Sequence, residues 1–293
     1  MKLWSKNTLI LILVLLVGLD VLVWREIVFA KVFDKLEIYF FDVGQGDSEL
    51  VVLPGKVKIL IDGGPSNKIL SYLPEIFPLF DRYVDLVINS HPHPDHFVGL
   101  IDVLKNYQVG EFLDNGCDGG IPAWEELEKT VAAEKVPELI LAAGDKIFYQ
   151  NNELDILAPD KNFIKQKDLN ETSLVVLLKN SDAKALFVGD SGAAVEKYLA
   201  AKFQIQADIL KVGHHGSKYS STAEFLKAVA PKIAVIEVGK NTYGHPTPET
   251  LSHLANIGAM IFRTDLDGTV KLVADKKQIH IYQMSSSPFI FLN

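Results

Sequence analysis

Short apolar runs alternate with polar turns along most of the chain, and their spacing predicts a mixed α/β fold. Three β-rich runs come first, at 36–43, 48–53 and 57–62, separated by turn signals at 44–47 and 54–55. Helical and strand patterns then alternate. We expect helices at 67–80, 97–107, 124–135, 192–202, 222–230 and 247–257. We expect strands at 84–89, 109–114, within 138–158, and at 170–178, 184–188, 207–212, 232–238, 259–264, 268–273 and 278–283.

The order of these elements indicates how they pack. Strands come first, strand–helix alternation follows, and the same arrangement is then repeated. A sheet with an apolar face must bury that face against another layer. We therefore expect two sheets packed together with helices outside, an αββα sandwich, in residues 36–284, followed by a tail at 285–293.

An apolar segment precedes this domain. Residues 9–19 carry no charge, and Asp20 separates them from the apolar stretch 21–24. The uncharged run has the length of a signal-peptide core, and small residues at 28–30 fit a cleavage site. Residues 8–24 also fit a single uncleaved membrane anchor.

Of these two interpretations we favour the anchor, in residues 1–30, with a linker at 31–35. The folded domain is then expected on the outer side of a membrane. Secretion after cleavage of a signal peptide is the alternative.

Composition narrows the class of protein. Hydrophobic residues make up 48% of the chain, which is enough for a substantial core. The net charge of −8 argues against a protein that coats nucleic acid with a broad basic surface, although a local basic groove in an enzyme remains compatible with it. Cys117 is the single cysteine of the sequence, which excludes an intramolecular disulfide and a cysteine-rich metal site.

The loop after the predicted strand 84–89 holds the strongest candidate for chemistry. His91, His93, Asp95 and His96 follow one another closely in it. Neutral imidazole and carboxylate groups together suit zinc, manganese or iron. Open α/β folds place their chemistry at the carboxyl ends of strands. The sequence therefore predicts a metal site at the end of this strand.

The pattern His91-x-His93-x-Asp95-His96 resembles the signature of the metallo-β-lactamase superfamily. Three other segments that end predicted strands also resemble motifs of that family, namely Ile59–Gly64, Ala185–Ser191 and Leu210–Ser217. The resemblance implies the αββα metallo-β-lactamase-like fold and two divalent metal ions. Zinc is favoured, and manganese is the alternative.

The resemblance also implies a role for each motif residue. Asp62 would orient the ligand loop from behind the metal ligands. Asp190 would bridge the two ions, which a shared anion screens from one another. The expected metal ligands are His91 and His93 for one ion, Asp95, His96 and His215 for the other, and Asp190 for both.

Two features of this set leave alternatives open. Adjacent side chains of an extended segment point to opposite sides, so we expect one ligand from His214 and His215 and favour His215. Many members of the family carry a third histidine for the first ion, but the matching region 168–173 contains none. Asn170 stands in its place, as a residue next to the ligands. The first ion should therefore be bound more weakly.

The string Phe41–Ser48 indicates a branch of the family. Together with 170–174, 211–217 and 241–246, it resembles the soluble hydrolase domain of ComEC-type competence proteins, and phosphorylcholine esterases of the same superfamily are similar. The resemblance covers about residues 36–283. It does not extend to the multi-helix membrane channel of competence proteins, so we expect no DNA channel from this chain alone.

Hydroxyl and amide groups near these motifs predict a phosphate site. Residues 216–221 lead into the predicted helix at Thr222, where hydroxyls, backbone N–H groups and a lysine would meet at a helix N-terminus. An ordinary Ser/Thr cap is the alternative. Asp42 and Asp47 are expected only to shape the turn near the metals. The expected substrate-binding residues are Ser217, Lys218, Ser220, Ser221, Asn241 and Tyr243.

The predicted function is hydrolysis of phosphodiesters by a metal-bound hydroxide, with DNA cleavage as one form of this activity. Asp95 belongs to the expected catalytic group, and His214 and His245 would stabilise the transition state or protonate the leaving oxygen. The expected partners are a phosphate ester, nucleic acid included, and a membrane at the N-terminal segment. The alternatives are another ester, lactone, thioester or lactam as substrate, or a non-catalytic anchored binding subunit.

Overall fold

The structure, a computed structural model, describes the backbone of residues 5–29 and 35–284, and the side chains of 5–22 and 35–284. The predicted tail at 285–293 and most of the predicted linker lie outside the described residues. The chain divides into two compact units, residues 1–32 and 33–293.

A helix, α1 (Lys6–Phe29), is present where the sequence predicts an apolar segment. Most of its large apolar side chains in the described part are exposed, and Ile12 is half-buried. Over the side chains that the structure describes, no helix combines the length and the apolar character needed to cross a membrane. Residues 23–30 of the predicted anchor lie outside the side chains that the structure describes.

The second unit contains two β-sheets. Sheet A has the strand order β15-β14-β1-β2-β3-β4-β5-β6, and sheet B has the order β13-β12-β11-β10-β9-β8-β7. Sheet A is formed by β1 (Leu36–Phe40), β2 (Glu49–Val52), β3 (Lys58–Ile61), β4 (Tyr83–Ile88), β5 (Gln108–Asp114), β6 (Glu138–Ile140), β14 (Thr269–Asp275) and β15 (Gln278–Met284). Sheet B is formed by β7 (Lys146–Tyr149), β8 (Asn152–Ala158), β9 (Val175–Lys179), β10 (Lys184–Phe187), β11 (Ile209–Lys211), β12 (Ile233–Ile236) and β13 (Met260–Arg263).

Seven helices accompany the sheets, together with three short 3₁₀ turns, among the residues described. The helices are α2 (Ile69–Ile76), α3 (Pro94–Asn106), α4 (Pro122–Ala133), α5 (Ala193–Lys202), α6 (Ala223–Val229), α7 (Pro248–Asn256) and α8 (Thr264–Asp267). The 3₁₀ turns are η1 (Phe163–Lys165), η2 (Leu169–Thr172) and η3 (Gly213–Gly216).

Alternation along the strands explains the layers. In β1, Ile38 and Phe40 are buried between the two sheets, and the Phe40 ring stacks on Phe187 of sheet B with centroids 6.2 Å apart. Tyr39, which points to the other face of β1, packs with the side chains of α2, α3 and α4.

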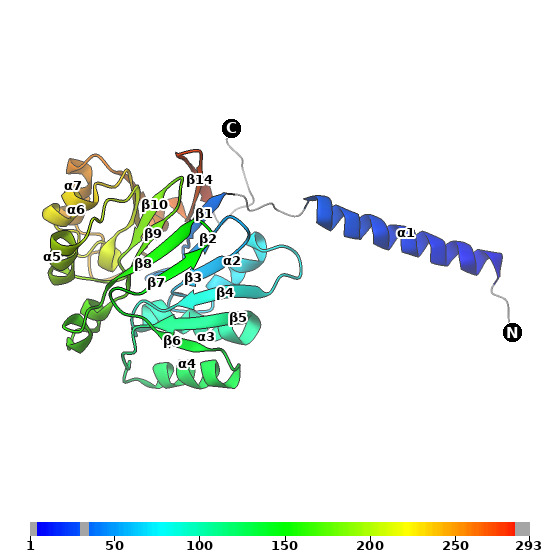
Figure 1. Ribbon diagram of the computed structural model, residues 1–293, viewed down its shortest axis with the longest axis horizontal. Coiled ribbons are helices and arrows are strands. Elements are labelled where there is room, and N and C mark those ends of the chain that lie inside the picture. Colours follow the sequence, from blue (N-terminus) through cyan, green and yellow to red (C-terminus); the bar gives the residue numbers. More distant parts are fainter. Residues whose placement is uncertain (1–4, 30–34, 285–293) are drawn as a thin grey trace. The chain divides into compact units, whose positions relative to one another are not determined.

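A third apolar cluster lies on the outer face of sheet B, where Leu186 packs with side chains of α5, α6 and α7. Figure 1 shows these three helices grouped on one side, with α3 and α4 beside sheet A. The predicted arrangement of two sheets with helices on both outer faces is therefore found.

Parallel pairing brings the functional loops to one edge. Strands β3 to β6 are parallel to one another, and so are β10 to β13. The loops that follow β3, β4, β10 and β11 carry Asp62, His91, Asp190 and His215. The carboxyl ends of parallel strands share one edge of a sheet, which places these side chains together.

Two local predictions need correction. Residues 170–172, which we expected to begin a strand, lie in the turn η2, and β9 begins only at Val175. The Asp168 side chain accepts a hydrogen bond from the backbone of Asn170, which stabilises a turn rather than a strand. The short helix α8 was not expected, because its four residues are too few for a periodic pattern.

Candidate metal centre

The histidine loop connects the buried strand β4 to helix α3. Asn89, Ser90 and His91 are buried, His93 is the N-cap residue of α3, and Pro94 begins the helix. Proline at the first helical position fits because that residue needs no backbone donor. The histidine rings lie close together, with centroids 4.7 Å apart for His91 and His93, and 4.2 Å apart for His91 and His96.

Four predicted ligands converge around one point. The candidate ligand atoms of Asp95, His96, Asp190 and His215 all lie within 4.8 Å of one another, and we call this set the closed position. Asp190 Oδ2 lies 3.5 Å from Nε2 of both His96 and His215. Asp95 Oδ2 lies 3.2 Å from His215 Nε2. Two imidazoles and two carboxylates in this arrangement suit a divalent metal ion.

The other predicted position is less enclosed. His91 and His93 with Asp190 form what we call the open position, and within the described residues they do not gather three ligand atoms as tightly as the closed position does. Asn170 belongs to the loop beside it. The Asn170 side-chain oxygen is buried and has no hydrogen-bond partner among the described residues. Its backbone carbonyl accepts a hydrogen bond from Ser173 Oγ.

Asp62, the expected orienting residue, contacts the histidine loop from behind. Its Oδ2 lies 2.8 Å from His96 Nδ1 and accepts a hydrogen bond of 2.6 Å from Ser90 Oγ. Its Oδ1 accepts a hydrogen bond from the Ser90 backbone N–H at 2.7 Å. The Ser90 hydroxyl also lies 3.0 Å from His91 Nδ1. Asp62 thus contacts His96 directly and His91 through Ser90. Because these contacts are made to the Nδ1 atoms, the Nε2 atoms of both histidines are left to face the centre.

Asp190 lies just after β10 and is buried. The preceding residue, Gly189, has φ +52°, a conformation that glycine adopts without strain. Ser173 Oγ accepts a hydrogen bond from the Asp190 backbone N–H at 3.2 Å. The loop that replaces the expected third histidine therefore contributes to the position of the predicted bridging carboxylate.

The backbone at His214 and His215 differs from the extended segment that we expected. Both have left-handed backbone conformations, with φ of 49° and 52°, so they are not part of an extended segment. Both imidazoles approach Asp190 Oδ2, at 3.8 Å for His214 Nε2 and 3.5 Å for His215 Nε2. His215 is buried, whereas the His214 side chain is 25% exposed. His215 therefore lies in the closed position, and His214 lines the side that faces solvent.

The pKa values of these groups follow from their crowding. Burial alone would lower the pKa of His215, but the carboxylates of Asp190 and Asp47 raise it to about 10. The pKa of His96 lies well above its ordinary value because Asp190 and Asp62 outweigh its burial. The pKa of Asp190 lies well below its ordinary value because His215 and His96 outweigh burial. Protons and metal ions therefore compete for the same nitrogens.

Several important residues were not found from the sequence. Asp47, Glu49, Glu237 and Lys211 are all buried beneath the closed position. We expected Asp47 only to shape a turn, yet its carboxylate contacts Lys211 and His215. The sequence did contain a signal for this buried cluster, because Lys211 lies inside the apolar run Ile209–Val212. A lysine is rarely buried without a charged partner, so its position indicated buried carboxylates nearby.

The predicted phosphate site at the start of α6 is occupied by the chain itself. The carboxylate of Glu196, from α5, accepts hydrogen bonds from the backbone N–H groups of Ser221 and Thr222 and from the Thr222 hydroxyl. Ser217 is buried, and the Ser220 hydroxyl donates to the carbonyl of Gly213 at 2.7 Å. The Ser221 hydroxyl is buried and has no hydrogen-bond partner among the described residues. The backbone N–H groups that were expected to bind an anion are therefore already paired with Glu196.

Asn241 also differs from the expectation. Its amide group donates to the carbonyls of Gly239 and His245 and accepts from the backbone N–H groups of Tyr243 and His245. These bonds fix the loop and leave the side chain no donor or acceptor aimed at a substrate. The side chains of Lys218 and Tyr243, by contrast, are exposed to solvent.

A row of rings leads from the surface to the metal ligands. The Tyr243 ring lies 5.7 Å from that of His245, which in turn lies 5.7 Å from that of His214. Burial, followed by the charges of His214 and His215, lowers the pKa of His245. The structure thus brings the two predicted catalytic histidines, His214 and His245, to one side of the closed position.

The donor atoms fit a metal centre. Nε2 of His91, Nε2 of His96 and Oδ1 of Asp190 are buried and lack hydrogen-bond partners among the described residues. A buried polar atom without a partner is costly unless a ligand satisfies it. The imidazole and carboxylate donors suit zinc and manganese alike.

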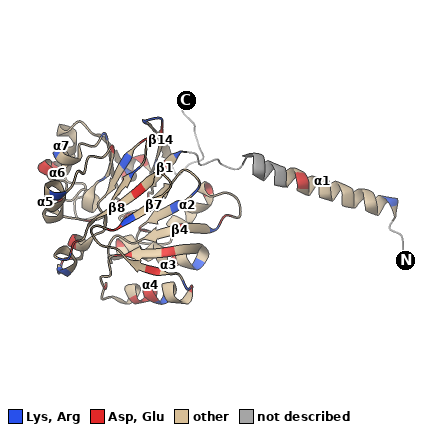
Figure 2. Cartoon of the chain, in the orientation of Figure 1, with Lys and Arg blue, Asp and Glu red and all other residues tan. Residues whose placement is uncertain are grey.

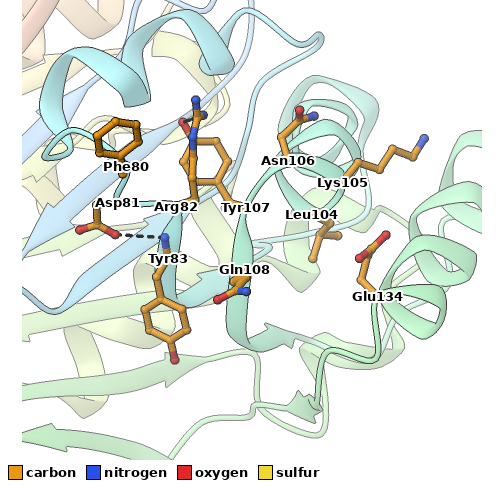
Figure 3. Close-up of a pocket in the computed structure, with 10 residues that line it drawn as sticks. All are labelled: Phe80, Asp81, Arg82, Tyr83, Leu104, Lys105, Asn106, Tyr107, Gln108 and Glu134. Carbon is orange, nitrogen blue, oxygen red and sulfur yellow. Dashed lines mark hydrogen bonds between the residues drawn. The ribbon is translucent and has the colours of Figure 1, made fainter. Parts of the chain in front are cut away.

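One surface hollow lies away from these residues. It has a volume of about 500 Å³ and is lined by residues at the start of β4 and the end of α3, with Asp81 bonded to the Tyr83 backbone (Figure 3). Arg82, which lines it, already donates to the Tyr107 hydroxyl at 3.1 Å. This end of sheet A is opposite the histidine loop, so the hollow takes no part in the candidate site.

The curated relatives of this chain are longer proteins, and the match covers only part of each. ComE operon protein 3 of Bacillus subtilis (strain 168) is 29% identical over 257 residues, which cover 80% of this chain and 32% of that protein. Recombination protein 2 of Haemophilus influenzae is 30% identical over 247 residues, which cover 83% of this chain and 29% of that protein. The chain therefore spans about a third of the length of these relatives.

Solved structures with the same fold have little sequence in common with this chain. The metallo-beta-lactamase fold protein YhfI from Bacillus subtilis has a TM-score of 0.56 at 12% identity, covering 81% of this chain and all of that one. Tm1679, a metal-dependent hydrolase of the beta-lactamase superfamily, has a TM-score of 0.54 at 16% identity. The match covers 82% of this chain and all of the Tm1679 chain.

A family model described as the metallo-beta-lactamase superfamily matches residues 41–239, more than half of the chain. The matched segment includes every predicted metal ligand and the orienting residue Asp62. The resemblance found in the sequence is thus confirmed, and the chain belongs to the metallo-beta-lactamase superfamily.

Proposed function

We propose that this protein is a metal-dependent hydrolase of phosphodiesters and that it cleaves nucleic-acid strands. The observation that carries the proposal is the closed position, where Asp95, His96, Asp190 and His215 converge beside two solvent-side imidazoles. Divalent metal ions, when bound there, supply an activated water and stabilise charge on phosphoryl oxygens. Asp95, His96 and His215 would hold one ion, His91 and His93 the other, and Asp190 would contact both.

His214 and His245 are suited to assist at the solvent side. The lowered pKa of His245 favours the neutral form of its imidazole, which carries one ring N–H donor. Its Nδ1 atom is buried and has no hydrogen-bond partner among the described residues. A donor of this kind can stabilise negative charge on a phosphoryl or leaving oxygen.

The rim of the site supports a nucleic acid as substrate. Tyr219 and Tyr243 are 67% and 74% exposed, and Lys218 and Lys240 are exposed next to them in the chain. The two loops are joined by a hydrogen bond of 2.9 Å from the Thr247 backbone to the Gly216 carbonyl. Exposed tyrosines stack on bases, and lysines contact the phosphates between them. The charges are otherwise mixed over the chain, so this basic rim is local (Figure 2).

The names of the relatives agree with this substrate class. One matched protein is called recombination protein 2 and another competence protein ComA, of Neisseria gonorrhoeae, which is 25% identical over 266 residues. The rim and these names together favour nucleic acid over a lactam or lactone.

The test uses the purified full-length chain with end-labelled single-stranded DNA and a small aryl phosphodiester, each with added zinc or manganese. We expect cleavage of both substrates, and none by the His93→Ala/Asp95→Ala variant. We also expect Tyr219→Ala/Tyr243→Ala to slow DNA cleavage while leaving the small diester unaffected. Equal loss on both substrates would remove the proposed stacking role.

Cleavage of the small diester alone would point to another phosphodiester as the natural substrate. Metal-loaded protein that cleaves neither substrate would contradict the proposal. Esters, lactones, thioesters and lactams would then be assayed with the same pair of proteins.

A further inference from the structure

Asp47 lies behind the closed position and contacts two of its ligands at once. Its Oδ1 atom is 3.2 Å from His215 Nδ1, and its Oδ2 atom is 3.6 Å from His96 Nδ1. These are the ring nitrogens opposite to the Nε2 atoms that face Asp190. His96 follows a strand of sheet A and His215 follows a strand of sheet B. One buried carboxylate therefore connects imidazoles contributed by the two sheets.

Lys211, the last residue of β11, connects Asp47 to the predicted bridging residue. Its ammonium group forms an ion pair with Asp47 and donates a hydrogen bond of 2.9 Å to the carbonyl of Gly189. The same Nζ atom lies 3.8 Å from Asp190 Oδ1. Both Lys211 and Asp47 are fully buried, so neither can contact a substrate.

The surroundings explain why a lysine is needed there. Carboxylate oxygens of Asp47, Glu49 and Glu237 lie within 4.8 Å of one another, close enough to hold a cation. Lys211 supplies that positive charge from within the chain. A buried carboxylate without a compensating charge is strongly destabilising. Asp47 can therefore remain ionised and in place only while Lys211 is present.

We propose that Asp47 and Lys211 form a positioning pair that holds His96, His215 and Asp190 in the geometry of the closed position. The nearer partners of the two Nδ1 atoms are Asp62, 2.8 Å from that of His96, and the Glu237 carbonyl, 2.9 Å from that of His215. The negative charge of Asp47 lies beside both Nδ1 atoms and adds to these partners in keeping each ring oriented with Nε2 toward the metal position. Lys211 fixes Asp47 and the Gly189 carbonyl that precedes Asp190. The proposal rests on the metal-dependent function proposed above and does not depend on the substrate.

The test measures metal binding by the full-length chain, with cobalt(II) as the probe. Affinity is obtained by competition with a chromophoric chelator, and ligand geometry from the visible absorption of bound cobalt. We expect Asp47→Asn to lower the affinity about 10- to 100-fold, as the loss of outer ligand partners does elsewhere, and to alter the cobalt spectrum. Lys211→Met should also lower the affinity, and Lys211→Arg should restore most of it.

The double variant Asp47→Asn/Lys211→Met removes both buried charges and so avoids leaving either one unpaired. If the two residues act as one unit, its affinity should fall as far as that of Asp47→Asn and no further. A folded double variant that binds cobalt with the affinity and spectrum of the unchanged protein would overturn the proposal. So would a Lys211→Met variant that binds metal as tightly as the unchanged protein.

Lys58→Met is the matched control, because Lys58 is also buried and pairs with Asp81 at 2.7 Å, away from the metal ligands. We expect it to lower the melting temperature without changing cobalt affinity. An equal loss of affinity in this control would show that any buried lysine has the same effect, and the pair would lose its specific role. The cobalt-binding assay uses no substrate. A protein that binds cobalt as expected but hydrolyses nothing would therefore contradict the proposed function and leave the positioning pair intact.

Discussion

The two candidate metal positions share Asp190 but differ in how completely the chain surrounds them. The closed position gathers four ligand atoms within 4.8 Å and is backed by Asp62, Asp47 and the carbonyl of Glu237. The open position has two histidines, one of them only half-buried, beside a turn that contains no third imidazole. Ligands that are held by buried partners need little rearrangement to bind an ion. The comparison teaches that one fold can preorganise one metal position much more strongly than its neighbour.

The largest effect is expected from the residue that the two positions share. Asp190→Asn removes the carboxylate that faces His96 and His215, and it leaves Lys211 close to an uncharged amide. We expect metal binding and hydrolysis to fall to the limit of detection, measured by metal content after dialysis and by diester turnover. Asp118→Asn, at an exposed aspartate of a surface loop, serves as the control and should retain both. Retention of a full metal complement by Asp190→Asn would refute the bridging assignment.

The difference in metal affinity between the closed and open positions is tested by substituting one histidine from each. We expect His215→Ala to weaken the tightly bound ion by at least about 10- to 100-fold, because even outer partners of ligands contribute that much. His93→Ala should leave the tight ion in place and abolish binding of the second. Stoichiometry by elemental analysis, combined with chelator titration, distinguishes the two outcomes. Loss of the tight ion from His93→Ala would show that the open position is the stronger site.

The acidic layer beneath the closed position should make stability depend on pH. Burial, with a further contribution from Asp47, raises the pKa of Glu49 to about 8. A carboxyl group with a raised pKa in the folded state contributes stability at low pH, and this contribution is lost as pH rises from the unfolded value towards 8. Glu49→Gln replaces the protonated acid with a neutral amide. We therefore expect it to stabilise the metal-free protein by about 2 kcal/mol at pH 9 and by little at pH 4.

Urea denaturation of both proteins at the two pH values measures this difference. Glu126→Gln is the control, because Glu126 is exposed and pairs with the exposed Lys105, so it should change stability by less than about 1 kcal/mol at either pH. A constant difference between Glu49→Gln and the unchanged protein across the pH range would contradict the raised pKa of Glu49.

The smallest effect is expected from an attempt to complete the open position. Asn170→His introduces an imidazole where the side-chain oxygen is buried and has no hydrogen-bond partner in the described part of the chain. A third protein ligand should strengthen binding of the second ion by about 10-fold, which corresponds to about 1.4 kcal/mol. Isothermal titration with zinc would measure it, with Asn162→His on an exposed turn as the control. If Asn170→His left the affinity for the second ion unchanged, residue 170 would not face the open position.

Much of the fold was predictable because it depends on local patterns. The alternation in β1 sends Ile38 and Phe40 to one face and Tyr39 to the other, which is enough to require layers on both sides of the sheet. The spacing of His91, His93 and His96 at a strand end identified the metal loop, because such residues have little reason to cluster for packing. The turn η2 was missed because individual side-chain hydrogen bonds, such as the one that Asp168 accepts from the Asn170 backbone, stabilise it and leave no periodic pattern.

The sequence by itself determined the order of elements, the family motifs and the ligand types. Tertiary structure alone decided which neighbouring groups those side chains meet. Glu196 occupies the helix start where Ser221 was expected to bind phosphate, and left-handed backbone at His214 turns two adjacent imidazoles toward Asp190. Asp47 meets Lys211 only because the two sheets pack face to face. Ionic and hydrogen-bond partners far apart in the chain carry no local pattern, since their energy arises only when folding buries them together.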